Sequence, residues 1–267
     1  MDAEETARDH YGGDDLEARV LGALRGAGFD VDHLRVDDLT GVDQLHAGFV
    51  PATEYLLGAL DLTSETRLLD VGAGIGGPAR LAADRHGCRV TGIDLSPDFV
   101  DLARTLTERV GLADRVAFDV GSATAMPYDD ASFSRAMINH VGMNIEAKDQ
   151  VFAEVRRVLE PDGRFGVYEQ MRVGDGDLTF PMPWAEDAAS SFVETRERYV
   201  ELLQAAGFSI ERDEDRTAAV ATAGPPPAGS LTPADLFGSG FAERIGNNIA
   251  ATMAGMLSPI LIVARAE

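Results

Sequence analysis

The sequence is poor in basic residues and in cysteine. Its 267 residues include 23 Lys and Arg against 45 Asp and Glu, a formal net charge of −22, and Lys148 is the only lysine. Nucleic acids and anionic membrane surfaces both attract clustered basic side chains, so this balance argues against either as a partner. The single cysteine, Cys88, excludes a disulfide framework or a cysteine zinc cluster within one chain. No Asp or His spacing indicates a catalytic metal, so we expect none.

Long apolar runs are also absent. No stretch approaches the ~18 residues of a membrane-spanning helix, and residues 1–17 are too acidic and polar for a secretory signal. We therefore expect a cytoplasmic protein that binds a small molecule, and a homodimer is compatible with the sequence. The length fits one large domain or one domain with an insertion, and a hydrophobic content of 45% suffices for a sizeable core.

Short apolar runs alternate with helical stretches from Thr66 onward. The expected strands cover residues 67–71, 89–93, 115–119, 133–139 and 164–170. The helices between them are expected at residues 76–86, 97–110 and 146–159. This alternation predicts an α/β fold with a parallel, doubly wound sheet. Before it, the pattern predicts helices over residues 14–28 and 44–60, joined by an Asp-rich loop at 30–43.

The turn after the first strand is rich in glycine. Gly72, Gly74 and Gly77 satisfy G-x-G-x-x-G, a pattern that also serves dinucleotides. Asp70 distinguishes a dinucleotide from a ligand with an ammonium group, because a carboxylate at this strand end is unfavourable beside a pyrophosphate and favourable beside an ammonium. S-adenosylmethionine carries an ammonium and a sulfonium but no phosphate. We therefore assign Asp70, Gly72, Ala73 and Gly74 to S-adenosylmethionine, and an NAD-dependent oxidoreductase remains the alternative of another class.

Two further strand ends offer adenosine contacts. Asp94, with Leu95 after it, lies 22 residues beyond the first glycine, where a carboxylate can accept both ribose hydroxyls. A helix-capping role is the alternative for Asp94. Ser122 and Ala123 follow the third strand and can meet the adenine edge, unless they only form a turn.

Four motifs, in order and spacing, resemble the class I S-adenosylmethionine-dependent methyltransferases: residues 70–77, 92–94, 126–133 and 155–164. Further stretches, including residues 10–12 and 140–145, look like the small-molecule group that contains sarcosine/dimethylglycine N-methyltransferases and borders the ubiquinone/menaquinone-type enzymes. The resemblance implies a Rossmann-like, doubly wound, seven-stranded sheet with a reversed C-terminal hairpin. It also implies an N-terminal helical cap over residues 1–62, a methyltransferase domain over 63–267, and an acceptor lid at about 171–206. Ser122 stands where the family commonly has an acidic residue.

Asn139 and His140 close the fourth strand, at the edge where open sheets bind ligands. In the family this edge faces the cofactor methionine and the acceptor. We expect His140 to be the catalytic base, with a structural histidine as the alternative, and Asn139 to bind the cofactor. The resemblance also implies that the N-terminal segment folds over the cofactor, which makes Tyr11 a catalytic candidate.

The acceptor-side candidates are Asn144, Glu169 and Trp184. Glu169 could balance a cationic amine or pair with an arginine, and Trp184 could cage a methylated ammonium or belong to the core. A capping or helix-face role is expected for His46.

The resulting hypothesis is methyl transfer from S-adenosylmethionine to a small-molecule acceptor, with an amine such as sarcosine or dimethylglycine preferred. C- or O-methylation of a quinone, phenol or natural-product scaffold is the alternative, because Phe180, Met182, Trp184 and residues 253–256 could supply an apolar pocket. A protein that binds S-adenosylmethionine without catalysis is also open.

Overall fold

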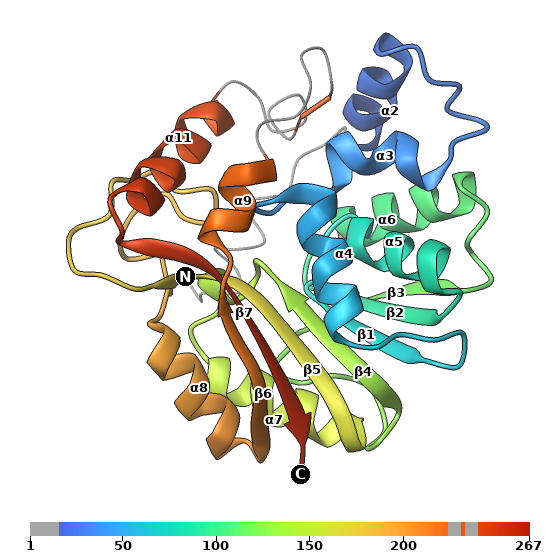
Figure 1. The fold of residues 1–267 in the computed structure, drawn as a ribbon. Helices are drawn as coiled ribbons and strands as arrows, with labels where there is room; N and C mark the ends of the chain where they lie inside the picture. The colour runs from blue at the N-terminus through green and yellow to red at the C-terminus, as the bar shows by residue number, and fades with distance from the viewer. Residues whose placement is uncertain (1–15, 224–230, 233–239) are drawn as a thin grey trace.

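The computed structural model describes residues 16–223, 231–232 and 240–267 (Figure 1). Its centre is a seven-stranded sheet with the order β3-β2-β1-β4-β5-β7-β6. The strands are β1 (Arg67–Val71), β2 (Arg89–Asp94), β3 (Val116–Val120), β4 (Phe133–Asn139), β5 (Leu159–Arg172), β6 (Phe208–Asp215) and β7 (Leu257–Ala266). The α/β class is confirmed, and the five parallel strands lie where the apolar runs predict them.

β7 runs opposite to the other six strands of the sheet. β1 pairs in parallel with β2 and β4, and β4 pairs in parallel with β5. β7 then runs antiparallel between β5 and β6, which is the expected reversed hairpin. Because β1, β2 and β4 are parallel neighbours, their carboxyl ends meet at one edge of the sheet. Asp70, Asp94 and Asn139 lie at or near these ends.

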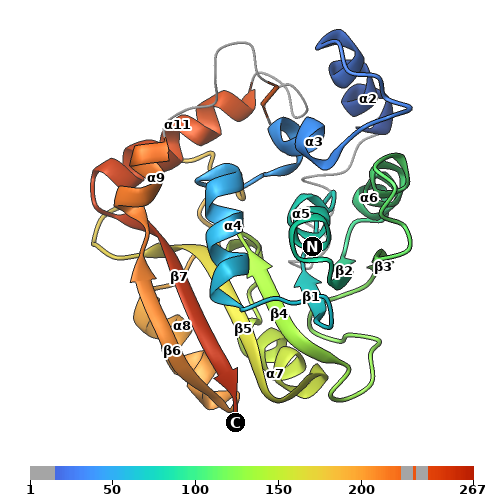
Figure 2. The same ribbon diagram turned by 45° about the vertical axis from the view of Figure 1, so that its right-hand side comes forward.

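The helices cover both faces of this sheet (Figure 2). One face carries α4 (Phe49–Ala59), α5 (Gly77–His86) and α6 (Pro97–Arg109), whose side chains form a core with Leu68 and Tyr168. The other face carries α7 (Lys148–Val158) and α8 (Arg196–Ala205), which pack with Leu69 and Val167. Adjacent residues of one strand therefore enter different cores, as the two-residue period of a strand requires.

The N-terminal half differs from the sequence-based expectation. The helix α2 (Leu16–Gly26) is confirmed, but residues 30–43 contain α3 (Val36–Asp43), and α4 begins at Phe49 rather than at residue 44. In α3, Asp38 accepts a hydrogen bond from the backbone N–H of Arg35 at 2.9 Å, which helps to begin the helix despite its many acidic residues. The short segment Gln44–Gly48 is therefore not helical and crosses the edge of the sheet.

Three elements surround the far side of this edge. They are the irregular segment 173–195, α9 (Thr217–Ala223) and α11 (Gly240–Met253), of which α9 was not predicted. Figure 1 shows α9 and α11 beside the end of β7. The division into a cap and a methyltransferase domain at residue 63, and the lid at 171–206, stay predictions. None of the described helices combines the length and apolar character needed to cross a bilayer.

Candidate active site

A cavity of about 1260 Å³ opens at the carboxyl ends of β1, β2 and β4. Its lining includes most of the residues that the sequence assigns to a ligand: Asp70, Gly72, Ala73, Gly74, Asp94, Leu95, Ser122, Ala123, Asn139, His140, Asn144 and Trp184. The cavity is larger than a usual small-molecule pocket, and it has room for a cofactor and a second sizeable molecule.

Asp70 lies at the bottom of this cavity. Its side chain is almost fully buried, and its Oδ2 has no hydrogen-bond partner among the described residues. Burial, together with the nearby charge of Asp94, raises the pKa of Asp70 to about 7. A buried carboxylate without a counter-charge is costly. The position is therefore suited to a ligand that brings a positive charge.

Asp94 ties the end of β2 to the glycine-rich turn. Its Oδ2 accepts a hydrogen bond from the backbone N–H of Gly74 at 2.8 Å, and its Oδ1 accepts one from Ser96 at 3.0 Å. Burial raises its pKa, and these hydrogen bonds oppose that effect. The carboxylate thus stabilises the turn and the start of α6 while it also lines the cavity.

The glycines of the turn serve different purposes. Gly72 and Gly74 line the cavity with φ angles of 71° and 53°, a region that favours glycine. Gly77 does not belong to the cavity lining, and a Cβ at this position would lie 2.1 Å from the carbonyl oxygen of Asp43. The third glycine of the motif therefore permits α3 to approach α5 closely.

Ser122 and Ala123 line the cavity beyond β3. The Ser122 hydroxyl accepts a hydrogen bond from the backbone N–H of Thr124 at 3.1 Å, so it also stabilises its own turn. Their adenine contact stays a prediction.

Asn139 and His140 form the floor of the cavity between the cofactor side and the far wall. Both side-chain polar atoms of Asn139 and the Nε2 of His140 are buried, and none is hydrogen-bonded within the described ranges. Burial, and to a smaller extent neighbouring His46, lowers the pKa of His140 well below 6.5. The imidazole is therefore neutral near pH 7, and its Nε2 can accept a hydrogen bond from a bound molecule. Its φ of 57° is unusual for a residue with a side chain.

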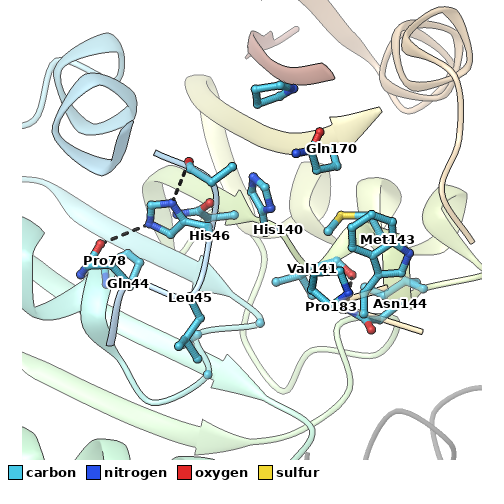
Figure 3. A pocket seen from close by; sticks show the side chains of 18 of the residues that line it. Gln44, Leu45, His46, Pro78, His140, Val141, Met143, Asn144, Gln170 and Pro183 are labelled. Atoms are coloured by element: carbon cyan, nitrogen blue, oxygen red, sulfur yellow. Dashed lines mark hydrogen bonds between the residues drawn. The ribbon is translucent and has the colours of Figure 1, made fainter. Parts of the chain in front are cut away.

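His46 is a cavity residue that sequence analysis missed. Figure 3 shows the rings of His46 and His140 near each other, and their centroids are 5.8 Å apart. The centroid of the Tyr168 ring lies 5.2 Å from that of His140. The His46 Nε2 is 2.8 Å from the Thr53 hydroxyl and 3.2 Å from Gln44 Oε1, and burial lowers its pKa to about 4. The sequence signal for a site here is the pair of polar residues Gln44 and His46, followed by Gly48, directly before the apolar helix α4.

Glu169 does not have the predicted acceptor-binding role. It is fully buried outside the cavity lining, and its Oε1 accepts hydrogen bonds from the backbone N–H groups of Val141 at 3.1 Å and Gly142 at 2.9 Å. The carboxylate therefore holds the turn that follows His140. The next residue, Gln170, points to the other face and lines the cavity instead.

The remaining predicted site residues are Trp184, Asn144 and Tyr11. Trp184 lines the cavity and donates from Nε1 to the Ser191 hydroxyl at 2.9 Å, while Asn144 donates to the carbonyl of Val141 at 3.3 Å. Tyr11 lies outside the described residues. In the described part of the chain, no three His, Cys, Asp or Glu side chains gather as a metal site would require.

Comparison with known families gives a match over the centre of the chain. Residues 69–167 match the model of a methyltransferase domain. This segment runs from β1 into β5 and contains both the glycine-rich turn and His140. Residues 69–167 form a class I S-adenosylmethionine-dependent methyltransferase domain. Proteins with this domain use S-adenosylmethionine as the methyl donor.

Curated relatives of this methyltransferase domain act on different molecules. The methyltransferase GfsG of Streptomyces halstedii is 36% identical over 49% of this chain and 47% of its own length. A sterol 24-C-methyltransferase of Gibberella zeae is 31% identical over 61% of this chain and 45% of its own length. The glycine/sarcosine/dimethylglycine N-methyltransferase of Actinopolyspora halophila is 30% identical over 60% of this chain and 28% of its own length. The chain thus spans less than half the length of these relatives.

Solved structures share the fold over the whole chain. Geranyl diphosphate C-methyltransferase from Streptomyces coelicolor A3(2) has a TM-score of 0.71 and 19% identity, and covers 100% of this chain and 98% of its own. The [4+2]-cyclase SpnF has a TM-score of 0.68 and 24% identity, with coverage of 100% and 97%. At this identity the likeness supports the Rossmann-like fold alone.

Proposed function

We propose that the protein transfers a methyl group from S-adenosylmethionine to a small-molecule hydroxyl or enol, with His140 as the base. The observation that carries the proposal is the buried imidazole of His140, whose Nε2 has no hydrogen-bond partner among the described residues, in the same cavity as the buried carboxylate of Asp70. The methyltransferase domain at residues 69–167 supports the class of reaction.

The cofactor side of the cavity fits S-adenosylmethionine. Asp70 would accept hydrogen bonds from the ammonium, which relieves its buried charge, and Asp94 would accept them from the ribose hydroxyls. The free Nδ2 of the Asn139 side chain would donate to the carboxylate end. When bound, S-adenosylmethionine supplies an electrophilic methyl group on a positively charged sulfur.

His140 would remove the proton of the acceptor. Its Nε2 would accept the hydroxyl proton while the acceptor oxygen or carbon bonds to the methyl group, so the proton ends on the imidazole. The bond between the methyl carbon and the cofactor sulfur breaks in the same step, and its electron pair stays on sulfur, which leaves S-adenosylhomocysteine. A hydroxyl or enol gains more from such a base than an amine does, because the lone pair of a neutral amine is already strongly nucleophilic, whereas a hydroxyl or enol becomes so as it loses its proton. An acceptor seated in the cavity would keep water from competing for the methyl group.

Two alternatives remain distinguishable. An amine such as sarcosine or dimethylglycine, the preferred acceptor from the sequence, is the substrate class named for the Actinopolyspora halophila relative. A protein that binds the cofactor without methyl transfer is the other, and the cyclase SpnF shows that this fold also occurs in a protein named for a different reaction.

Activity with labelled S-adenosylmethionine on a panel of phenols, enols, sarcosine and dimethylglycine tests the proposal. The variant His140→Ala should lower kcat by about 100-fold or more on the best acceptor and leave the Kd of S-adenosylhomocysteine within about threefold. Exposed His33, 84% accessible and outside the cavity lining, gives the matched control His33→Ala, which should change neither. Turnover of the amines alone, or an unchanged kcat in His140→Ala, would refute the proposal.

A further inference from the structure

The charged side chains that line the cavity are all acidic. Its charged lining residues are Asp43, Asp70, Asp94 and Glu146, and none of the described lining residues is Lys or Arg. A phosphate or carboxylate taken into a buried site needs a cation or several donors to offset its lost hydration. We infer that the acceptor is a mainly apolar molecule without an anionic group and with one hydrogen-donating head. This inference rests on the proposed function, because it names the acceptor class of that site.

The cations nearest to the cavity are engaged elsewhere. The Lys148 ammonium is partly buried and donates to the carbonyls of Ile145 at 2.6 Å and Phe192. Arg216 stacks over a tyrosine ring at 3.5 Å, and Arg244 donates to the carbonyl of Met182 at 3.0 Å and forms an ion pair with a glutamate. None of these three lines the cavity. An anionic acceptor would have to break one of these arrangements to gain a counter-charge.

Arg80 offers no counter-charge either. It is completely buried behind the cavity wall, where its guanidinium pairs with Asp43 at 3.0 Å and donates to the carbonyl of Ile75 at 2.7 Å. The pair joins α3 to the glycine-rich turn, and it leaves the cavity side of the wall without positive charge. Acceptors with a phosphate or carboxylate are therefore disfavoured.

The apolar side of the cavity is a stripe on α11. Phe241, Ile245, Ile249 and Met253 all line the cavity, and a spacing of four residues places them on one face of the helix. Ile249 is 53% exposed and Met253 85% exposed. Trp184 also belongs to the lining, whereas Phe180 and Met182 do not. An apolar acceptor would cover this stripe and gain its burial energy.

The head of the acceptor would meet hydrogen-bond acceptors. The Nε2 of His140 and the Oε1 of Gln170 are both buried and have no partner within the described residues, and both residues line the cavity. Figure 3 shows His140 and Gln170 on neighbouring strands with their side chains toward the cavity. A neutral hydroxyl can donate to this pair, whereas a carboxylate cannot. The polar end and the α11 stripe thus fit one amphipathic molecule without an anionic group.

Binding of two naphthols tests this acceptor class. 2-Naphthol and 6-hydroxy-2-naphthoate differ by one carboxylate, and their dissociation constants are measured by calorimetry with and without S-adenosylhomocysteine. We expect the neutral naphthol to bind at least tenfold more tightly. Ile249→Arg should weaken 2-naphthol by about tenfold and strengthen the naphthoate, because it replaces an apolar contact with a cation. Ala250→Arg places the same charge on the neighbouring exposed residue outside the lining, and should change neither.

The outcomes separate the two proposals. Equal binding of both naphthols, no binding of 2-naphthol, or equal effects of the two arginine variants would overturn the acceptor class. Failure to bind S-adenosylhomocysteine would overturn the proposed function, and the naphthol preference would still be measured in the cofactor-free protein.

Discussion

Replacing Asp70 with asparagine removes the buried charge and keeps the shape of the side chain. Raising the pKa of this carboxyl from 3.8 to about 7 costs its ionised form about 4 kcal/mol in the folded, cofactor-free protein. A carboxyl with a raised folded-state pKa loses stability as the pH rises from 3.8 to about 7. Asp70→Asn should therefore stabilise the cofactor-free protein, by about 1–2 kcal/mol at pH 5 and about 4 kcal/mol at pH 8.

The same substitution should weaken cofactor binding, because the ammonium loses its counter-charge. Urea unfolding at pH 5 and pH 8 measures the free energy of unfolding, and calorimetry at pH 8 measures the Kd of S-adenosylhomocysteine. We expect a more stable variant with at least tenfold weaker binding, since a hydrogen bond between charged groups contributes about 1.5–3 kcal/mol. A stability gain that is equal at both pH values, or an unchanged Kd, would refute the assignment of Asp70 to a bound cation.

Further predictions concern packing, ion pairing and the base. Gly77→Ala should lower the free energy of unfolding by about 1–3 kcal/mol, because its Cβ would lie 2.1 Å from a backbone oxygen of Asp43; denaturant unfolding checks this. Arg80→Met should cost about 3–5 kcal/mol by the same measurement, since it leaves Asp43 buried without its partner. Glu169→Ala should lower kcat with little change in cofactor Kd, and Glu169→Gln, which can still accept both backbone hydrogen bonds, should restore most of it. The acid limb of the pH profile of kcat, measured with saturating S-adenosylmethionine so that Asp70 is engaged, should lie below pH 6.5, because burial lowers the pKa of His140.

Control variants and opposite results test the predictions for Gly77, Glu169 and His140. Gly58 lies exposed in α4, and a Cβ at this position would have no atom within 4 Å, so Gly58→Ala should stabilise by about 0.5–1 kcal/mol where Gly77→Ala destabilises. Equal effects of the two alanines would contradict the packing argument. Equal losses in both Glu169 variants would contradict its positioning role, and an acid limb above pH 6.5 would contradict a neutral His140.

The cofactor side of the cavity could be predicted because local sequence places it. Asp70, Asp94 and Asn139 each follow or end an apolar run, and parallel strands bring such ends to one edge. The bounds of β4 agree completely with the pattern of the sequence. Neighbouring parallel strands supply most of this geometry, so no long-range information was needed.

The acceptor side could not be predicted in the same way. His46 meets His140 only because the segment before α4 crosses the sheet edge, a contact between residues 94 positions apart that no local pattern encodes. The error at Glu169 was avoidable. Alternate residues of a strand face opposite sides, so Tyr168 beside His140 places Gln170 in the cavity and Glu169 beneath it.

His140 and the apolar stripe are held by different elements of the fold, and this affects how acceptor preference can change in evolution. Its backbone N–H donates to the carbonyl of Tyr168 at 2.8 Å, and Glu169 holds the turn after it, so β5 fixes the imidazole from below. The apolar stripe belongs to α11, far along the chain and on another element. Substitutions on that helix can change the recognised molecule without moving the base. A lineage built this way can acquire new acceptors while its chemistry stays intact.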